Sequence, residues 1–244
     1  MSRYYYDLHI HSCLSPCGSD ESTPDSICGM GELNGLDILA LTDHNSLKNC
    51  PAFFAAAERH GVIPVAGAEV TTAEDIHALC LFETLEGALR FDTLLHGHLA
   101  PIKNRPDIFG EQIIMNDRDE RTGSEELLLI NATDITLDEL PGVIEPYGGV
   151  CWPAHIDREA NGVISVLGAF PEYPRFAFAE LYDRSRLDEF SASTGIDKEH
   201  FLVSSDAHTL WNIKERTDFL DLRCEGKDAE TVRRALFGYL RCGE

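Results

Sequence analysis

The sequence predicts an α/β fold of barrel type, and three observations lead to it. Seven short segments rich in apolar and β-branched residues recur along the chain, and segments with helical spacing lie between several of them. The strand segments are apolar on both faces, which is typical of mainly parallel strands covered on both sides. The chain has 244 residues, of which 43% are hydrophobic, and we expect one domain over residues 1–244.

The expected elements alternate along the chain. The seven strand segments are residues 4–12, 36–44, 62–72, 75–83, 149–157, 176–183 and 200–208. The first helix has Thr23 as its cap, Pro24 at its first position and Gly35 as its stop, and the second ends at Gly61. The four expected helices cover residues 23–35, 51–61, 85–99 and 228–240.

Residues 101–140 interrupt this alternation. Within them, residues 111–134 have the pattern of two strands joined by a charged turn. We therefore expect a β-hairpin-like excursion from the barrel and not a second domain. Such an excursion is either a solvated surface hairpin or a lid or dimer arm.

Charge and hydropathy limit the classes of partner. The chain has 42 acidic and 20 Lys/Arg residues, a net charge of -22, without an evident basic cluster. Because binding to long nucleic acids needs a positive surface, we expect a small substrate and no long nucleic acid. No apolar run is long enough to span a membrane and the N-terminus lacks an apolar signal segment, so we expect no membrane partner and a cytoplasmic location. The sequence assigns no oligomeric state.

Cysteines do not indicate a disulfide framework. The eight are scattered without a C-x-x-C pair, so free thiols are expected, most of them packed as small buried hydrophobes. They are Cys13, Cys17, Cys28, Cys50, Cys80, Cys151, Cys224 and Cys242.

Histidines and carboxylates recur at the ends of the strand segments. His9 and His11 end the first, and because side chains alternate along a strand, both can face one metal ion. Asp206 and His208 end the last in the same way. Strand ends converge on one rim of an α/β barrel, where active sites form. The others are Asp43 and His44, Glu69, His77 and His155, of which His77 opens its strand and fits this pattern less well. His96 and His98 repeat the spacing on a helical pattern, where residues two apart do not share a face.

The set “DLHIHS…LTDHNS…GAEV…H…PAHID…SSDAH” resembles the PHP (polymerase and histidinol phosphatase) domain superfamily from near residue 5 to near residue 210. The resemblance implies a distorted (β/α)7 TIM-like barrel with two or three divalent metal ions (Zn, Mn or Fe) at the strand ends. It implies one site made of His9, His11, Glu69 and Asp206. Glu69 would bridge to a second metal held also by His77 and His155, and His44 and His208 would hold a third. In this third site Cys17 stands where the family commonly has His or Asp.

These residues predict hydrolysis of a small phosphate monoester by a metal-activated water that attacks phosphorus in line. Arg158 and Arg184 follow predicted strands and are candidates to clamp the phosphate, or are surface salt-bridge residues. Asp7, Asp43 and Asp157 lie beside ligand candidates, where they either fix imidazole tautomers or hold backbone turns. Two alternatives remain: a phosphodiesterase or nuclease acting on nucleotides or short oligonucleotides, and a non-catalytic metal-stabilised module.

Overall fold

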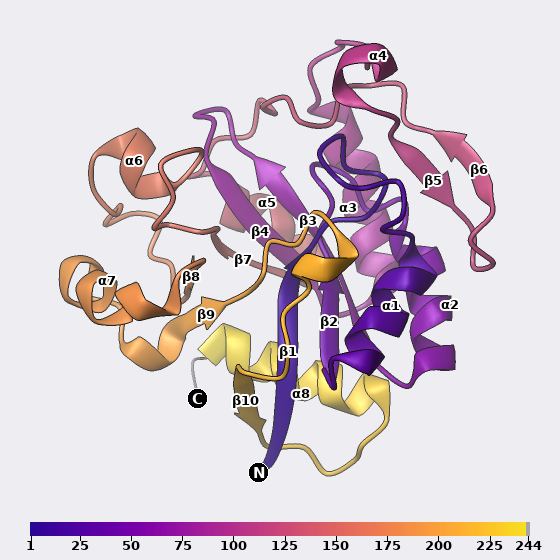
Figure 1. Cartoon of the computed structure of the whole chain (residues 1–244). Helices are drawn as coiled ribbons and strands as arrows, with labels where there is room; N and C mark the ends of the chain where they lie inside the picture. The colour runs from indigo at the N-terminus through magenta and orange to yellow at the C-terminus, as the bar shows by residue number, and fades with distance from the viewer. Residues whose placement is uncertain (243–244) are drawn as a thin grey trace.

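A curled sheet of six strands organises the computed structural model, which describes residues 1–242 (Figure 1). Its strand order is β10-β1-β2-β3-β4-β7, and two further two-stranded sheets pair β8 with β9 and β5 with β6. The strands are β1 (Ser2–Ile10), β2 (Ile38–Leu41), β3 (Ile63–Thr71), β4 (His77–Phe82), β5 (Ile113–Met115), β6 (Arg121–Ser124), β7 (Gly149–Pro153), β8 (Ala179–Leu181), β9 (Phe201–Val203) and β10 (Phe219–Leu222).

All seven predicted strand segments contain a strand, but their directions differ from the expectation. The pairs β1–β2, β2–β3 and β8–β9 are parallel, whereas β4 runs antiparallel to both β3 and β7. The reason is the short connection between β3 and β4, because a parallel crossover needs about a dozen residues. The sequence reading missed β10, which pairs antiparallel with β1.

Helices pack against both faces of the sheet. Thr23 caps α1 by accepting a hydrogen bond from the Ser26 amide, and α2 ends at Gly61 in the left-handed conformation, as expected. The helices are α1 (Pro24–Leu33), α2 (Cys50–His60), α3 (Leu85–Gly97), α4 (Pro106–Phe109), α5 (Leu140–Ile144), α6 (Val163–Leu167), α7 (Leu187–Thr194) and α8 (Ala229–Cys242).

Two apolar cores lie on opposite faces of the curled sheet. The outer core packs α1, α2 and α3 against the sheet through residues such as Ile27, Phe53 and Phe91. The inner core joins side chains from the β1–β4 strands, from β7 and from the β8–β9 region with Leu236 and Phe237 of α8. Strands that share one interior form a barrel-like wall, so the predicted distorted TIM-like barrel is confirmed.

The predicted excursion contains the hairpin of β5 and β6 and packs beside α1 and α2 (Figure 1). The Ile113 amide donates to the Cys13 carbonyl, and the Asn49 side chain bonds to the backbone of Ile113 and Met115. At the turn, the Asp119 carboxylate accepts a hydrogen bond from Thr23. The hairpin is therefore fixed against the loop that leaves β1, on the side of the molecule that carries the rim.

Two further expectations concern cysteines and membranes. The seven cysteines from Cys13 to Cys224 are free thiols, and the Cys242 side chain lies outside the described residues. Within residues 1–242, no helix combines the length and apolar character that crossing a bilayer requires.

Candidate metal centre

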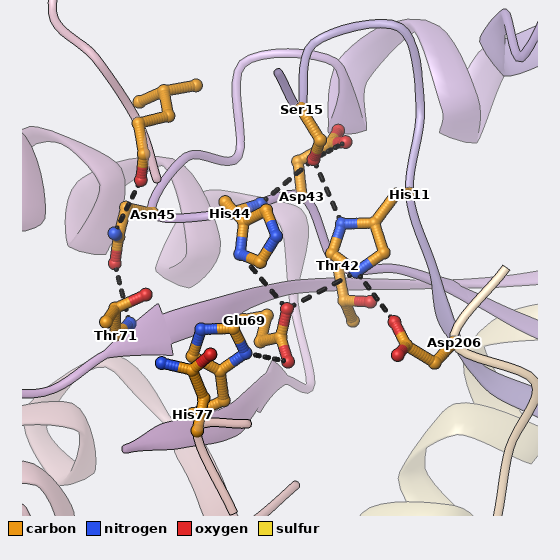
Figure 2. Close-up of polar contacts among 12 residues, drawn as sticks. His11, Ser15, Thr42, Asp43, His44, Asn45, Glu69, Thr71, His77 and Asp206 are labelled. Carbon is orange, nitrogen blue, oxygen red and sulfur yellow. Dashed lines mark hydrogen bonds and ion pairs between the residues drawn. The ribbon is translucent and has the colours of Figure 1, made fainter. Parts of the chain in front are cut away.

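The sequence-predicted metal residues meet at the rim where β1, β2 and β3 end and β4 begins (Figure 2). The antiparallel direction of β4 explains why His77 belongs to this rim although it opens its strand, because it pairs with Thr71 at the end of β3. Three groups of ligand atoms lie close enough to hold an ion: His9, His11, Glu69 and Asp206; His44, Glu69 and His77; and His11, Cys17, His44 and His208.

The first group, here called the acceptor cluster, consists of His9, His11, Glu69 and Asp206. The Nε2 atoms of His9 and His11 lie only 3.1 Å apart, as the alternation of side chains along β1 predicted. Asp206 Oδ1 lies 3.3 Å from the first nitrogen and 3.2 Å from the second. Glu69 faces the same point, at 3.4 Å from His9 and 3.3 Å from His11. Four side chains thus aim ligand atoms at one buried position.

Glu69 belongs to both the first and the second of these groups. Its Oε1 lies 2.8 Å from His77 Nδ1 and 3.0 Å from His155 Nε2, and its Oε2 lies 3.1 Å from His44 Nδ1. A carboxylate with two oxygens facing different imidazoles can bridge two cations. The bridging position that the family resemblance implied for this residue stays a prediction.

Cys17 lies at the open side of the centre. It shares its group with His11, His44 and His208, and the His11 and His208 rings stack with centroids 4.4 Å apart. Desolvation and the nearby Glu69 carboxylate raise the pKa of the Cys17 thiol above its ordinary value. A bound cation would reverse this effect, because metal coordination deprotonates a thiol.

Two residues not named as candidates orient the paired histidines of β1. Ser15 Oγ donates a hydrogen bond to Asp43 at 2.7 Å and lies 3.0 Å from His11 Nδ1. The serine oxygen therefore accepts a hydrogen bond from the N–H of His11 Nδ1 (Figure 2). Asp43 therefore acts on His11 through Ser15. Glu180 of β8 contacts His9 directly, with Oε1 2.8 Å from Nδ1. The sequence signal for Glu180 is an acidic residue inside an otherwise apolar strand, which the sequence analysis did not use.

Asp7 and Asp157 hold backbone, as the second of their two predicted roles describes. Asp7 accepts the amides of Ser205 and Lys214, and Asp157 accepts those of Tyr182 and Asp183. These contacts fix the loops that follow β8 and β9.

The two arginine candidates separate in the structure. Arg158 lines a cavity of about 100 Å³ together with His77, Asn161 and other rim residues, and its guanidinium bonds to Asp206 Oδ2 and stacks on the Tyr182 ring at 4.0 Å. Arg184 is not among the residues lining this cavity, and its guanidinium pairs with Asp218. The structure thus brings only Arg158 to the clustered residues.

Electrostatics indicate that the centre fits a cation. Burial lowers the pKa of His9, but the three neighbouring carboxylates outweigh it and raise the pKa well above its ordinary value. For His11 the same opposition raises the pKa to about 9. Asp206 Oδ1 is buried and makes no hydrogen bond within residues 1–242, although two imidazole nitrogens face it. Two carboxylates and two imidazoles that face one point form a set of nitrogen and oxygen ligand atoms that suits a divalent cation.

Several of the non-glycine residues with positive φ angles lie at the same rim. His155, Asp206 and Asn45 have positive φ angles of 28°, 50° and 47°. Such conformations are unfavourable for residues with a Cβ and gather at functional sites. Asn45 is held by its own side chain, which bonds to the Leu129 carbonyl and to the Thr71 amide (Figure 2).

The remaining described histidines lie outside these groups. His98 pairs with Asp134 at 2.6 Å, and His96 lies 3.9 Å from Glu125. Neither occurs in a metal-capable group among residues 1–242.

Several known proteins resemble this chain. An error-prone DNA polymerase from Symbiobacterium thermophilum is 31% identical over 91 residues, which is 37% of this chain but only 8% of the polymerase. The endonuclease Q from Pyrococcus furiosus, described as a lesion-specific endonuclease, superposes with a TM-score of 0.64 at 19% identity, covering 97% of this chain and 56% of the endonuclease. A complex of endonuclease Q with a 27-mer duplex that has an abasic lesion gives a TM-score of 0.62 at 19% identity, covering 97% of this chain and 57% of that one.

A two-domain protein from Bacteroides vulgatus, containing a predicted PHP-like metal-dependent phosphoesterase, matches with a TM-score of 0.52 at 15% identity, covering 97% of this chain and 63% of that protein. At these low sequence identities, the superpositions show a shared fold and nothing further. The model of the PHP domain matches residues 7–144, which include the first six of the clustered residues along the chain. That match spans more than half of the sequence, and the chain belongs to the PHP domain family.

Proposed function

We propose that this protein is a metal-dependent phosphoesterase that hydrolyses a small phosphate monoester at a centre of two or three divalent ions. The acceptor cluster carries this proposal, because four buried side chains aim nitrogen and oxygen atoms at one point and leave Asp206 Oδ1 without a hydrogen bond in the described part of the chain. PHP-family proteins are metal-dependent hydrolases, so the family and the site chemistry support the same reaction class.

The residues have distinct roles in this proposal. His9, His11, Glu69 and Asp206 hold one ion, Glu69 with His77 and His155 holds a second, and His44, His208 and Cys17 form a third position. When bound, divalent cations supply an acidified water and neutralise charge on the phosphoryl oxygens. Asn161, Arg158 and several of the proposed ligands line a cavity of about 100 Å³, in which we place the phosphoryl group.

Arg158 is the proposed phosphate clamp. Its guanidinium lines the cavity, and Tyr182 supports its planar face. It bonds to Asp206, and an Asp206 that binds a cation would leave the arginine donors for a phosphate oxygen. Arg184 has no comparable contact with the cavity lining, so we do not extend the clamp to it.

A second candidate is a phosphodiesterase or nuclease, and the endonuclease Q likeness favours it because it extends over 97% of this chain. One endonuclease Q structure contains a bound DNA duplex, so the comparison does not support our expectation that this protein has no long nucleic-acid partner. The net charge of -22 opposes binding of a long duplex but leaves a dinucleotide or short oligonucleotide open.

Turnover separates these candidates. We expect the Mn- or Zn-loaded protein to hydrolyse p-nitrophenyl phosphate faster than bis(p-nitrophenyl) phosphate. Faster cleavage of the diester, or nicking of a short duplex with an abasic site, would favour the nuclease. No hydrolysis of any of these by the fully loaded protein would favour a non-catalytic module. His9→Ala should lose metal and activity, whereas His98→Ala, at a surface histidine outside the site, should keep both.

A further inference from the structure

A buried carboxylate on β8 contacts two proposed metal ligands from outside the centre. Glu180 is 1% exposed and lies in a strand of otherwise apolar residues that pairs with β9 and not with β1. Its Oε1 accepts from His9 Nδ1 at 2.8 Å and from the His155 amide at 3.2 Å. One oxygen therefore links a ligand candidate of the first proposed metal position with one of the second.

The contact to His9 determines which ring nitrogen faces the centre. A carboxylate can only accept, so Nδ1 carries a proton, and in the neutral ring that binds a metal the lone pair lies on Nε2. That Nε2 atom points at the acceptor cluster, 3.3 Å from Asp206 and 3.1 Å from His11. With the other tautomer, a proton would occupy the position from which the ring would bind an ion.

The contact to His155 acts on the backbone. His155 has a φ of 28°, a conformation that costs energy unless neighbouring groups hold it. The Glu180 side-chain oxygen accepts a hydrogen bond from the amide of His155. The backbone carbonyl of Glu180 accepts another from the amide of Ile156. Glu180 thus supports the turn that carries the His155 ring toward Glu69.

The second oxygen gives independent evidence that the carboxylate is placed for these contacts. Glu180 Oε2 is buried and finds no hydrogen-bond partner in the described part of the chain. Leaving such a group unpaired is costly, so a purely structural role in β8 would be served better by an apolar residue.

We propose that Glu180 is a positioning residue of the metal centre, which fixes the Nδ1–H tautomer of His9 and the backbone of His155 through one oxygen. This inference rests on the proposed function, because it requires His9 and His155 to bind metal. His11 differs from His9 in being oriented through Ser15, so Glu180 is the carboxylate that acts on its histidine directly.

The test compares Glu180→Ala with Glu180→Gln. The glutamine carbonyl can still accept both N–H groups, so we expect zinc affinity within a few-fold of wild type. The alanine variant should bind zinc about 10- to 100-fold more weakly in competition with a chelating indicator. Asp218→Asn is the matched control, because it alters a buried carboxylate without a histidine contact and should leave the zinc affinity unchanged.

Nuclear magnetic resonance of the zinc-loaded wild type supplies a readout that does not depend on a variant folding. We expect a slowly exchanging proton on His9 Nδ1, retained in Glu180→Gln and lost in Glu180→Ala. A protonated Nε2 in the wild type would overturn the inference. So would Glu180→Ala with wild-type zinc affinity or Glu180→Gln as weak as alanine, provided His9→Ala loses a zinc ion. If His9→Ala keeps every ion, the proposed function itself fails.

Discussion

Two polar clusters, each with a buried carboxylate, differ in chemical character. The acceptor cluster brings two carboxylates against imidazole nitrogens, and a buried oxygen of Asp206 has no hydrogen bond within residues 1–242. The second, here called the ion-pair cluster, consists of Arg184, Lys214, Thr217 and Asp218. In it the Asp218 carboxylate accepts from Arg184, from Thr217 at 3.0 Å and from Lys214 at 3.4 Å.

The difference is one of completeness. In the ion-pair cluster, the cations and the hydroxyl satisfy the carboxylate, and the Lys214 amine also bonds to the Val203 carbonyl and lies over the Tyr6 ring at 4.3 Å. In the acceptor cluster Arg158 pairs with Asp206 Oδ2, but the buried Oδ1 makes no hydrogen bond within residues 1–242. A buried polar cluster that is complete from its own residues stabilises the fold, whereas one made of facing acceptors requires a ligand.

The largest expected effect comes from Glu69→Gln. Glu69 faces five imidazoles, so one lost charge weakens every proposed metal position. Because a catalytic metal supplies several kcal/mol, we expect a loss of roughly 1000-fold or more in kcat/KM. Metal analysis of the purified variant should show fewer ions per chain. A variant with full metal content and activity would contradict the bridging position.

Removal of metal and a substitution in the ion-pair cluster should each lower the unfolding free energy of the protein. Chelation should remove about 4 kcal/mol of unfolding free energy if zinc is held at about 1000 times its Kd. Asp218→Asn should remove about 3 kcal/mol, because it leaves the buried Lys214 with weaker compensation.

Thermal unfolding of wild type and Asp218→Asn, each with and without zinc, checks this. The two losses should add to within about 0.5 kcal/mol, because within residues 1–242 the Asp218 carboxylate bonds to Arg184, Lys214 and Thr217 and to no member of the acceptor cluster. A large coupling energy would mean that the two clusters form one network and do not contribute independently to stability.

A smaller effect distinguishes the two arginines. Arg158→Ala should lower kcat/KM about 30- to 100-fold, or roughly 2–3 kcal/mol, since it removes a charged donor from the cavity. Arg184→Ala should change kcat/KM less than about twofold, because its partner is Asp218. Steady-state kinetics with equal metal loading makes the comparison. Equal losses in the two variants would place Arg184 in substrate binding after all.

The sequence predicted most of the fold and the clustering of nine residues at one rim. Strand alternation was enough to pair His9 with His11, and the strand-end rule brought Asp206 and Glu69 to the same place. Their roles as metal ligands remain predictions. The hairpin at residues 111–134 followed from its turn and flanking apolar residues, and it was also correct.

Other features depend on tertiary geometry that one sequence does not encode locally. The position of His77 required the direction of β4, and the separation of Arg158 from Arg184 depends on where the loops after β7 and β8 turn. Glu180 lies on a strand outside the sheet of its partner His9, so no sequence spacing connects the two.

The smallest expected effect is the pH dependence of the ion-pair cluster. Burial lowers the pKa of Lys214 to about 8, and the nearby Asp7 and Glu180 carboxylates oppose this only in part. Between about pH 8 and the ordinary lysine pKa of about 10.4, the unfolded chain therefore binds more protons at this residue than the folded chain. The lysine contribution to the unfolding free energy should rise with pH across that window.

Denaturant unfolding of the metal-free protein at pH 7.5 and pH 10, compared with Lys214→Met, isolates this contribution. The difference between wild type and variant should shift in favour of wild type by on the order of 2 kcal/mol at the higher pH. Other titrating groups, such as the buried thiols, occur in both proteins and cancel in the difference. Parallel pH profiles would show that Lys214 keeps its ordinary pKa. The contacts of the ion-pair cluster would then fully offset the desolvation of the Lys214 charge. This cluster would differ even more from the acceptor cluster, in which a buried carboxylate oxygen has no hydrogen bond within residues 1–242.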